Sequence, residues 1–363
     1  ENMNDYQRLQ QKLHAHPAGA PATPTFDKIL RILFSPEEAA VAAQLNFVLM
    51  PLARIAEKTG QPADRLYPLL EAMADRGLVY AKPDREGNPR YCLLPTIPGL
   101  FEFPFMRIND PAKRDELGRL WHEYHREALG NEFAGSKTPQ MRVIPVQKSL
   151  PMNTEIMPYE VVADMINRAS YIALADCACR VSLGQCDRPR EVCLIFGDHG
   201  RFLVERGKAR SISRQEAIQV LDKAEEAGLV HTCNNSMEQF VVVCNCCPCC
   251  CTILRGLTEL HNPNAFARSG FIIKHTPEIC IICMACLEDR CPVQAITEND
   301  EGIAVDQELC IGCGLCVSVC PTGALELIRR EPVPAIPASN RELMTTILKE
   351  KGRLEDFIKV NQS

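Results

Sequence analysis

The sequence is poor in aromatic residues. Phe, Trp and Tyr make up 6% of its 363 residues, with one Trp and seven Tyr. Single-stranded nucleic acid is usually bound on aromatic side chains that stack on the bases, and this chain offers no such platform. The formal net charge is -6, whereas proteins that coat nucleic acid carry excess positive charge. Composition therefore argues against a protein whose main task is to coat nucleic acid.

The sequence also lacks the motifs of several enzyme classes. No Gly-x-Gly-x-x-Gly follows an expected strand, and neither a Walker A sequence nor a Gly-x-Ser-x-Gly elbow occurs, so a self-contained site for hydride or acyl transfer has no visible candidate. The longest apolar stretch, residues 39–53, is interrupted and too short to span a bilayer. Because the N-terminal residues do not read as a secretory signal, we expect a cytoplasmic protein whose thiols stay reduced.

Cysteine is the residue type that stands out. There are 20 in the chain, and 19 of them lie in the 144 residues from Cys177 to Cys320, with only Cys92 outside. A secreted protein stapled by disulfides would distribute its cysteines more evenly. In a reducing compartment, clustered cysteines indicate metal binding more often than disulfides.

Two cysteine runs near the C-terminal end share almost the same spacing. They consist of Cys280, Cys283, Cys286 and Cys291, followed by Cys310, Cys313, Cys316 and Cys320. The first three cysteines of each run are offset by 30 residues, and a proline follows each fourth cysteine. This motif resembles the bacterial-type ferredoxin that carries two [4Fe-4S] clusters, over residues 271–330.

The resemblance implies a crossed set of ligands, because each repeat wraps three corners of a cubane and the fourth ligand comes from the other repeat. Cluster 1 would then be held by Cys280, Cys283, Cys286 and Cys320, and cluster 2 by Cys291, Cys310, Cys313 and Cys316. Such ligation holds the two clusters close enough for an electron to pass between them. The first repeat has four residues instead of three before its last cysteine, which lengthens a surface loop without removing a ligand. Zinc or metal-free thiols are the alternative.

A second group of cysteines lies upstream and follows no standard spacing. Its members are Cys177, Cys179, Cys186, Cys193, Cys233, Cys244, Cys246, Cys247, Cys249, Cys250 and Cys251. Neighbouring cysteines do not easily pair with each other, and crowded thiolates repel unless a cation neutralises them. We expect one or two additional iron–sulfur clusters here, with zinc as the alternative. The arrangement is similar to that of iron–sulfur proteins of anaerobes in which such a run precedes a dicluster ferredoxin.

Several polar residues near the cysteines have two interpretations. Arg180 either offsets the charge of a cluster or is a surface cation. His199 and His231 are either ligands or proton carriers, or they are structural residues. His122 and His125 lack the spacing of a helical zinc site and are predicted to be surface or interface residues.

We expect an α+β multidomain protein. The segment 26–108 has the element order of a winged helix: Ser35 caps a helix, a helix over 63–76 ends at Gly77, and a hairpin follows over 78–94. A similar helix and hairpin over 211–243 form either a second winged-helix-like unit or a generic corner. The predicted domains are a flexible arm (1–25), a winged-helix-like domain (26–108), a helical connector (109–170), a cysteine-rich metal-binding domain (171–270), a dicluster ferredoxin domain (271–330), and a Pro-rich spacer with a C-terminal docking helix (331–363).

The first functional hypothesis is an iron–sulfur electron-transfer protein, or such a subunit of an anaerobic redox complex, without a substrate site of its own. Its partner would be a flavoprotein or metalloenzyme, within a homo- or hetero-oligomer. The amphipathic tail would dock the partner through Leu343, Ile347, Leu354 and Ile358.

Two alternatives remain. The first is a redox- or oxygen-sensing transcription regulator that binds DNA through the winged helix. Its expected recognition helix is net negative, with Asp64, Glu71 and Asp75 against Arg65 and Arg76, which disfavours DNA. The second is a reductase with a substrate site at residues 244–251.

Overall fold

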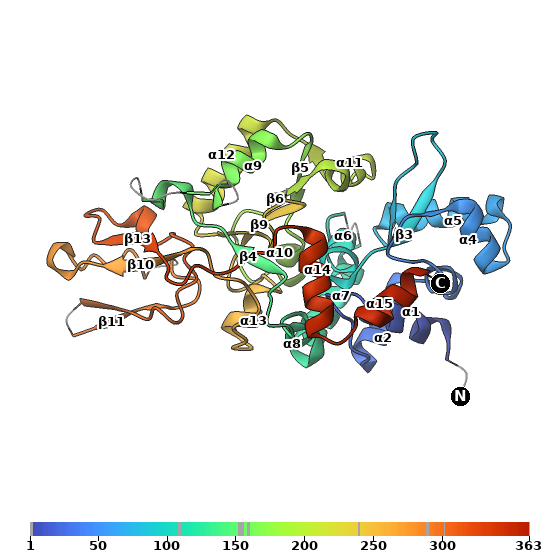
Figure 1. Cartoon of the computed structure of the whole chain (residues 1–363), viewed down its shortest axis with the longest axis horizontal. Coiled ribbons are helices and arrows are strands. Elements are labelled where there is room, and N and C mark those ends of the chain that lie inside the picture. The colour runs from blue at the N-terminus through green and yellow to red at the C-terminus, as the bar shows by residue number, and fades with distance from the viewer. Residues whose placement is uncertain are drawn as a thin grey trace.

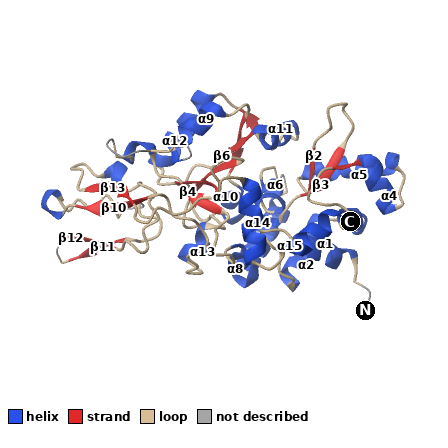
Figure 2. Ribbon diagram, in the orientation of Figure 1, coloured by secondary structure: helices blue, strands red, loops and turns tan. Residues whose placement is uncertain are grey.

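The computed structural model describes residues 3–107, 110–151, 156–157, 160–238, 240–287, 290–300 and 302–362. Three parts follow one another along the molecule: a mainly helical N-terminal part, a central sheet, and a part built of short strands and loops (Figures 1 and 2). As predicted, the fold mixes helices and sheets in several domains. Among the described helices, none is both long and apolar enough to cross a membrane.

The N-terminal part packs helices against a small sheet. Its elements are α1 (Asp5–His14), α2 (Pro24–Leu33), α3 (Pro36–Ala42), β1 (Met50–Pro51), α4 (Leu52–Thr59), α5 (Ala63–Arg76), β2 (Val79–Ala81) and β3 (Arg90–Leu93). The strand order is β1-β3-β2, with antiparallel pairs. The predicted cap is confirmed, since Ser35 and Glu38 form a capping box. The predicted end of α5 is also confirmed, because Gly77 follows it with a φ of 78°.

The prediction of a flexible arm over residues 1–25 is wrong. Asn4 and Gln7 form a capping box that starts α1. Leu9 and Leu13 on this helix are fully buried. A short helix can pack through a few apolar residues. The prediction missed those of α1 because the polar residues around them and the Ala- and Pro-rich segment that follows are typical of a linker.

The segment predicted as a helical connector is helical towards both ends and contains a strand between them. It contains α7 (Pro111–Tyr124), the π-helical turn η2 (His125–Leu129) and α8 (Gly130–Phe133), which follow η1 (Thr96–Leu100) and α6 (Glu102–Phe105). These elements are followed by β4 (Met141–Val143), the 3-10 turn η3 (Gln147–Ser149) and α9 (Val162–Arg168). Because β4 pairs with a strand of the central sheet, the second half of this segment belongs to the middle part.

The middle part is built on a six-stranded antiparallel sheet of order β4-β8-β9-β6-β5-β7. Its further strands are β5 (Ile172–Asp176), β6 (Glu191–Phe196), β7 (Arg210–Ser211), β8 (Val230–Asn234) and β9 (Val242–Cys246). Its helices are α10 (Ala178–Leu183), α11 (Gly197–Glu205), α12 (Arg214–Glu226) and α13 (Leu254–Thr258). The β8–β9 hairpin is part of this six-stranded sheet and not a separate wing. The prediction of a second winged-helix-like unit over 211–243 is therefore wrong, and the alternative, a generic helix–hairpin corner, describes the segment.

The third part has two antiparallel strand pairs. One is β10 (Phe271–His275) with β13 (Leu325–Arg329), and the other is β11 (Ile296–Asn299) with β12 (Gly302–Val305); the 3-10 turns are η5 (Pro277–Ile279) and η6 (Val317–Val319). It has its own core, which includes Phe271 and Leu327. Hydrogen bonds tie it to the middle part: the Val146 N–H donates to the Cys313 carbonyl over 2.8 Å.

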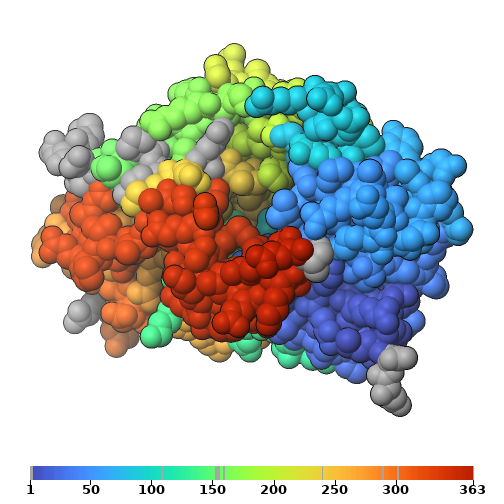
Figure 3. All heavy atoms as spheres, turned by 45° about the vertical axis from the view of Figure 1, so that its right-hand side comes forward, coloured from blue at the N-terminus to red at the C-terminus, as the bar shows by residue number. Residues whose placement is uncertain are grey.

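The C-terminal tail forms α14 (Asn340–Glu350) and α15 (Leu354–Gln362), which pack on the chain itself (Figure 3). The predicted docking residues Leu343 and Ile347 are buried within the protein, so they are not available to a partner. Lys351 and Arg353 both pair with Glu132 of α8. The prediction of a partner-docking helix is therefore wrong for α14, because its apolar face is already covered.

Candidate metal centres

The first ferredoxin-type cavity is lined by the four cysteines of the crossed scheme for cluster 1. Cys280, Cys283 and Cys286 surround it together with Cys320 of the other repeat. Burial raises the pKa of Cys320, but hydrogen bonds from the Leu325 N–H and the Thr322 hydroxyl outweigh burial and lower it below the ordinary value. Cys283 is exposed, so this cavity lies close to the molecular surface.

The second cavity is lined by Cys291, Cys310, Cys313 and Cys316. Three of these thiols, Cys310, Cys313 and Cys316, are buried, and Cys291 is partly buried. Burial raises the pKa of Cys313 to about 12, so that this thiol keeps its proton at neutral pH unless a metal displaces it. The Ala295 N–H donates to the Cys291 sulfur over 3.0 Å. Glu288 and Asp289, in the longer loop before Cys291, lie outside the described residues.

The two cysteine loops have positive φ values at equivalent positions, but with different residues there. Gly312 and Gly314 of the second loop have φ values of 70° and 76°. Thirty positions earlier, Ile282 and Met284 of the first loop have φ values of 52° and 59°. A Cβ on Gly312 would lie 2.1 Å from the Phe271 carbonyl oxygen, so glycine is required there. The first loop tolerates side chains because it faces solvent.

The register of the central sheet sorts the cysteines of the middle part onto two faces. Cys244 and Cys246 lie two residues apart on β9 and therefore point to the same face. The pairing of Leu194 with Val243 sets Cys193 of β6 opposite Cys244. Cys233 of β8 pairs with Val243 instead, so its side chain points to the other face. Cys233 is thus separated from the other thiols, and its sulfur donates to the Asn234 carbonyl.

Six cysteines, four of them buried and two partly exposed, form one set, which we call the six-thiol ring. Each thiol interacts with two others, and following these interactions around the set closes a ring: Cys177, Cys179, Cys251, Cys246, Cys244 and Cys193. The Thr232 hydroxyl lies 3.5 Å from the Cys246 sulfur, and the Leu254 N–H donates to Cys251. A ring of this size offers more sulfur ligands than the four that one cubane needs.

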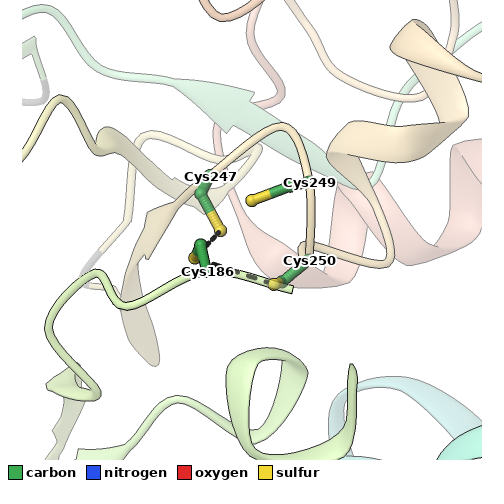
Figure 4. A group of neighbouring side chains, drawn as sticks. All are labelled: Cys186, Cys247, Cys249 and Cys250. Carbon is green, nitrogen blue, oxygen red and sulfur yellow. Dashed lines mark hydrogen bonds between the residues drawn. The ribbon is translucent and has the colours of Figure 1, made fainter. Parts of the chain in front are cut away.

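Four further cysteines form a tighter set, which we call the four-thiol site. Cys186, Cys247, Cys249 and Cys250 have sulfur atoms that all lie within 4.8 Å of one another (Figure 4). Cys186 comes from the loop after α10, and the others come from the turn after β9. The neighbouring Cys250 thiol and then Arg180 hold the pKa of Cys247 well below its usual range.

Arg180 is a buried residue of the metal region and not a surface cation. It is 1% exposed, donates twice to the Asn245 carbonyl over 3.1 Å, and donates to the Cys247 sulfur over 3.4 Å. A buried guanidinium beside sulfur ligands offsets their negative charge. Sequence reasoning missed Arg188, which donates to the Cys249 sulfur over 3.8 Å. A lone arginine in a loop has no pattern that would reveal this role.

The histidines near the cysteines contact other protein groups. His231 is buried and its Nδ1 lies 2.6 Å from the Asn245 side-chain oxygen, while His199 stacks on Tyr80. His125 corrects the prediction of a surface residue, because it is 3% exposed and burial lowers its pKa to about 4. Residues far along the chain, Ile97 and Ala265 among them, line the same small cavity as His125, and the spacing within its own helix does not reveal them.

Comparison with known proteins agrees with this geometry. Residues 303–326 match the model of the 4Fe-4S binding domain family. The chain is 37% identical over 111 residues to hydrogenase-4 component A of Escherichia coli K12, covering 27% of this chain and 52% of that protein. It is 30% identical over 112 residues to formate hydrogenlyase subunit 2 of the same organism, covering 28% and 54%.

Another relative is a tetrathionate reductase subunit of Archaeoglobus fulgidus, 42% identical over 55 residues that cover 14% of this chain and 26% of that protein. The chain thus spans about half the length, or less, of these relatives. No solved structure matches the chain significantly. Together, the family match and the clustered thiols show that the C-terminal part of this chain is a 4Fe-4S binding domain of the ferredoxin type.

Proposed function

We propose that this protein relays single electrons through two [4Fe-4S] clusters in its C-terminal part and through one further iron–sulfur centre in its middle part. The observation that carries this proposal is the pair of cavities, each lined by three cysteines of one repeat and one of the other. Cluster 1 takes Cys280, Cys283, Cys286 and Cys320, and cluster 2 takes Cys291, Cys310, Cys313 and Cys316. When bound, such clusters supply one-electron centres whose potentials depend on hydrogen bonds and burial.

The chain's own residues give the two sites different surroundings. Cys310, Cys313 and Cys316 are buried, whereas Cys283 is exposed. Burial excludes water from site 2, and exposure brings site 1 within reach of another protein. We therefore assign the surface at Cys283 as the point where electrons enter or leave.

Exposed apolar residues surround that point. Ile279, Ile281 and Ile282 are 48%, 62% and 49% exposed, and all flank Cys280 or Cys283. Isolated exposed apolar residues are ordinary, but a group beside an exposed ligand fits a small, transient redox interface. The partner we propose is a flavoprotein or metalloenzyme of a larger redox complex. The names of the relatives, a hydrogenase component and a reductase subunit, support this choice.

We assign the further iron–sulfur centre to the six-thiol ring. Four of its six thiols are buried, and the six exceed the four that a cubane requires. Thiolate ligands of this number need several positive ions to neutralise them. We place the protein in a reducing compartment, the cytoplasm, because thiols that are to hold metal must stay reduced.

The N-terminal part is proposed to be a winged-helix-like domain that serves contacts within the protein and not DNA binding. Its element order α3-β1-α4-α5-β2-β3 supports the assignment. Arg206 of the middle part pairs with Glu71 and Asp75 of α5, over 2.9 and 2.7 Å. Lys82 pairs with Asp198 of α11. The helix and hairpin that would meet DNA in a regulator thus contact the neighbouring part instead.

Iron and sulfide counting on the anaerobically purified chain tests the proposal. Two cubanes give about 8 Fe per chain, and a third centre of cubane size raises the count to about 12. Low-temperature paramagnetic resonance on the reduced protein should show interacting clusters. A count of 8 would overturn the assignment of the six-thiol ring, and a colourless protein that holds zinc alone would overturn the whole proposal. Gel shifts at several salt concentrations test the alternative hypothesis of a transcription regulator. Specific DNA binding would favour that hypothesis.

A further inference from the structure

The four-thiol site differs from the other cysteine sets in the spacing of its sulfur atoms. The Cys186 sulfur lies 3.9 Å from that of Cys247 and 3.8 Å from that of Cys250. Figure 4 shows the three sulfurs of the turn after β9 directed toward Cys186, which faces them from the opposite loop. Four thiols from two loops therefore converge on one small volume.

This spacing is that of four sulfurs bound to one ion. Zinc–thiolate bonds are about 2.3 Å long, and a tetrahedron of such bonds has edges of about 3.8 Å. In a cubane the thiolates stand farther apart, because four iron atoms lie between them. The distances at the four-thiol site thus fit a mononuclear centre and leave no room for a cubane.

The ferredoxin-type sites provide an internal comparison. Among the described residues, which include all twenty cysteines, only the four-thiol site brings three or more potential ligand atoms within 4.8 Å of one another. The quartets that line the two ferredoxin-type cavities do not, as expected for sites that enclose a larger group. The six-thiol ring does not either. The narrow spacing is therefore specific to Cys186 and its three partners.

The charges around the site also fit one divalent ion. Four thiolates and one Zn²⁺ carry a net charge of −2. Two cations contact the sulfurs, Arg180 at Cys247 and Arg188 at Cys249. The donor set is also complete, because four protein ligands close the tetrahedral shell and leave no position for a substrate, as in structural zinc sites.

We propose that Cys186, Cys247, Cys249 and Cys250 bind one structural Zn²⁺ ion, separate from the iron–sulfur centres. The ion ties the loop after α10 to the turn after β9. Cys179 of α10 and Cys246 of β9, both members of the six-thiol ring, lie next to these two segments in the chain, but the six-thiol ring has its own set of ligands and does not need the zinc ion. The ion carries no electrons, and the proposal does not depend on the electron-transfer function.

Metal analysis of the full-length chain, purified without oxygen, tests the proposal. We expect about one zinc per chain in addition to the iron. Cys249→Ser should remove the zinc and leave the iron count unchanged, whereas Cys249→His, which keeps a tetrahedral zinc ligand, should retain both. Cys233→Ser is the matched control, since Cys233 is a buried thiol of the same sheet outside both sets, and it should retain both metals.

X-ray absorption at the zinc edge should show four sulfur neighbours at about 2.3 Å. A wild-type chain without zinc, iron in place of zinc at this site, or a zinc shell of nitrogen and oxygen would each overturn the proposal. So would loss of iron instead of zinc in Cys249→Ser. An iron count that fails to show clusters, with zinc present as expected, would overturn the electron-transfer function alone.

Discussion

Two glycines of the second cysteine repeat offer a matched pair of substitutions. Gly312 and Gly323 have nearly equal φ values, 70° and 71°. A Cβ at Gly323 would meet nothing within 4 Å, whereas a Cβ at Gly312 would lie 2.1 Å from the Phe271 carbonyl oxygen and 2.2 Å from the Ser269 hydroxyl. Changing each to alanine imposes the same backbone penalty and differs only in the steric contact.

The expected magnitudes follow from these two terms. The left-handed conformation costs an alanine about 1–2 kcal/mol, which is the whole effect of Gly323→Ala. Gly312→Ala adds a steric clash with the Phe271 carbonyl oxygen, which β10 holds in place. Overpacking of this kind costs about 1–3 kcal/mol. The total for Gly312→Ala is then about 2–5 kcal/mol. Because the loop that must move carries Cys310 and Cys313, we expect this variant to lose about 4 Fe as well.

The assay is an anaerobic thermal midpoint together with the iron content of both variants. Gly323→Ala should keep the wild-type iron content and lower the midpoint slightly. Equal midpoints and equal iron contents for the two variants would refute the reasoning, because the close approach of Gly312 to β10 would then have no energetic consequence.

Three further predictions concern other parts of the chain. Glu132→Gln should loosen the C-terminal helices by about 3–5 kcal/mol, since it leaves Lys351 and Arg353 without their buried carboxylate; limited proteolysis of the tail measures this. Burial raises the pKa of Glu132, but the two cations lower it by more, so the folded-state pKa lies below the ordinary value of 4.5. The stabilisation is therefore complete above pH 4.5 and is lost as the pH falls through the folded-state pKa. Limited proteolysis of the tail at a series of acidic pH values checks this. Ile281→Glu should slow electron transfer to the partner about tenfold without changing the iron content, which stopped-flow reduction tests, and an unchanged rate would exclude this surface. Ile282→Gly should raise the thermal midpoint by relieving about 1 kcal/mol of left-handed strain, and a lowered midpoint would contradict it.

Local signals in the sequence predicted local structure well. The cap at Ser35 depends on Glu38, three positions later, and the end of α5 depends on Gly77 and the residues up to four positions before it. Both predictions are confirmed. The cysteines that line the two cavities are the ones that the resemblance to dicluster ferredoxins implies for each cluster, and their role as ligands stays a prediction. Structural features that depend on a few neighbouring residues can therefore be predicted from a single sequence.

The errors arose where distant contacts decide the structure. The tail has the amphipathic pattern of a docking helix, and the pattern itself is correct. Its partner, however, is the chain's own surface, since Glu132 receives Lys351 and Arg353 from more than 200 residues away. Amphipathicity says that a face will be covered, but not by what.

The division of the eleven middle cysteines follows from a principle that the sequence alone could not apply. Alternation along a strand separates Cys233 from Cys244, but only once β8 and β9 are known to pair with Val243 between them. The same alternation ends at the turn after β9, where Cys247, Cys249 and Cys250 leave the sheet and meet Cys186. The cysteines of residues 244–251 therefore fall into two sets, because the strand ends among them and Cys251, after the turn, rejoins the six-thiol ring. Spacing rules fail for such a run, since they assume that neighbouring thiols share one local conformation.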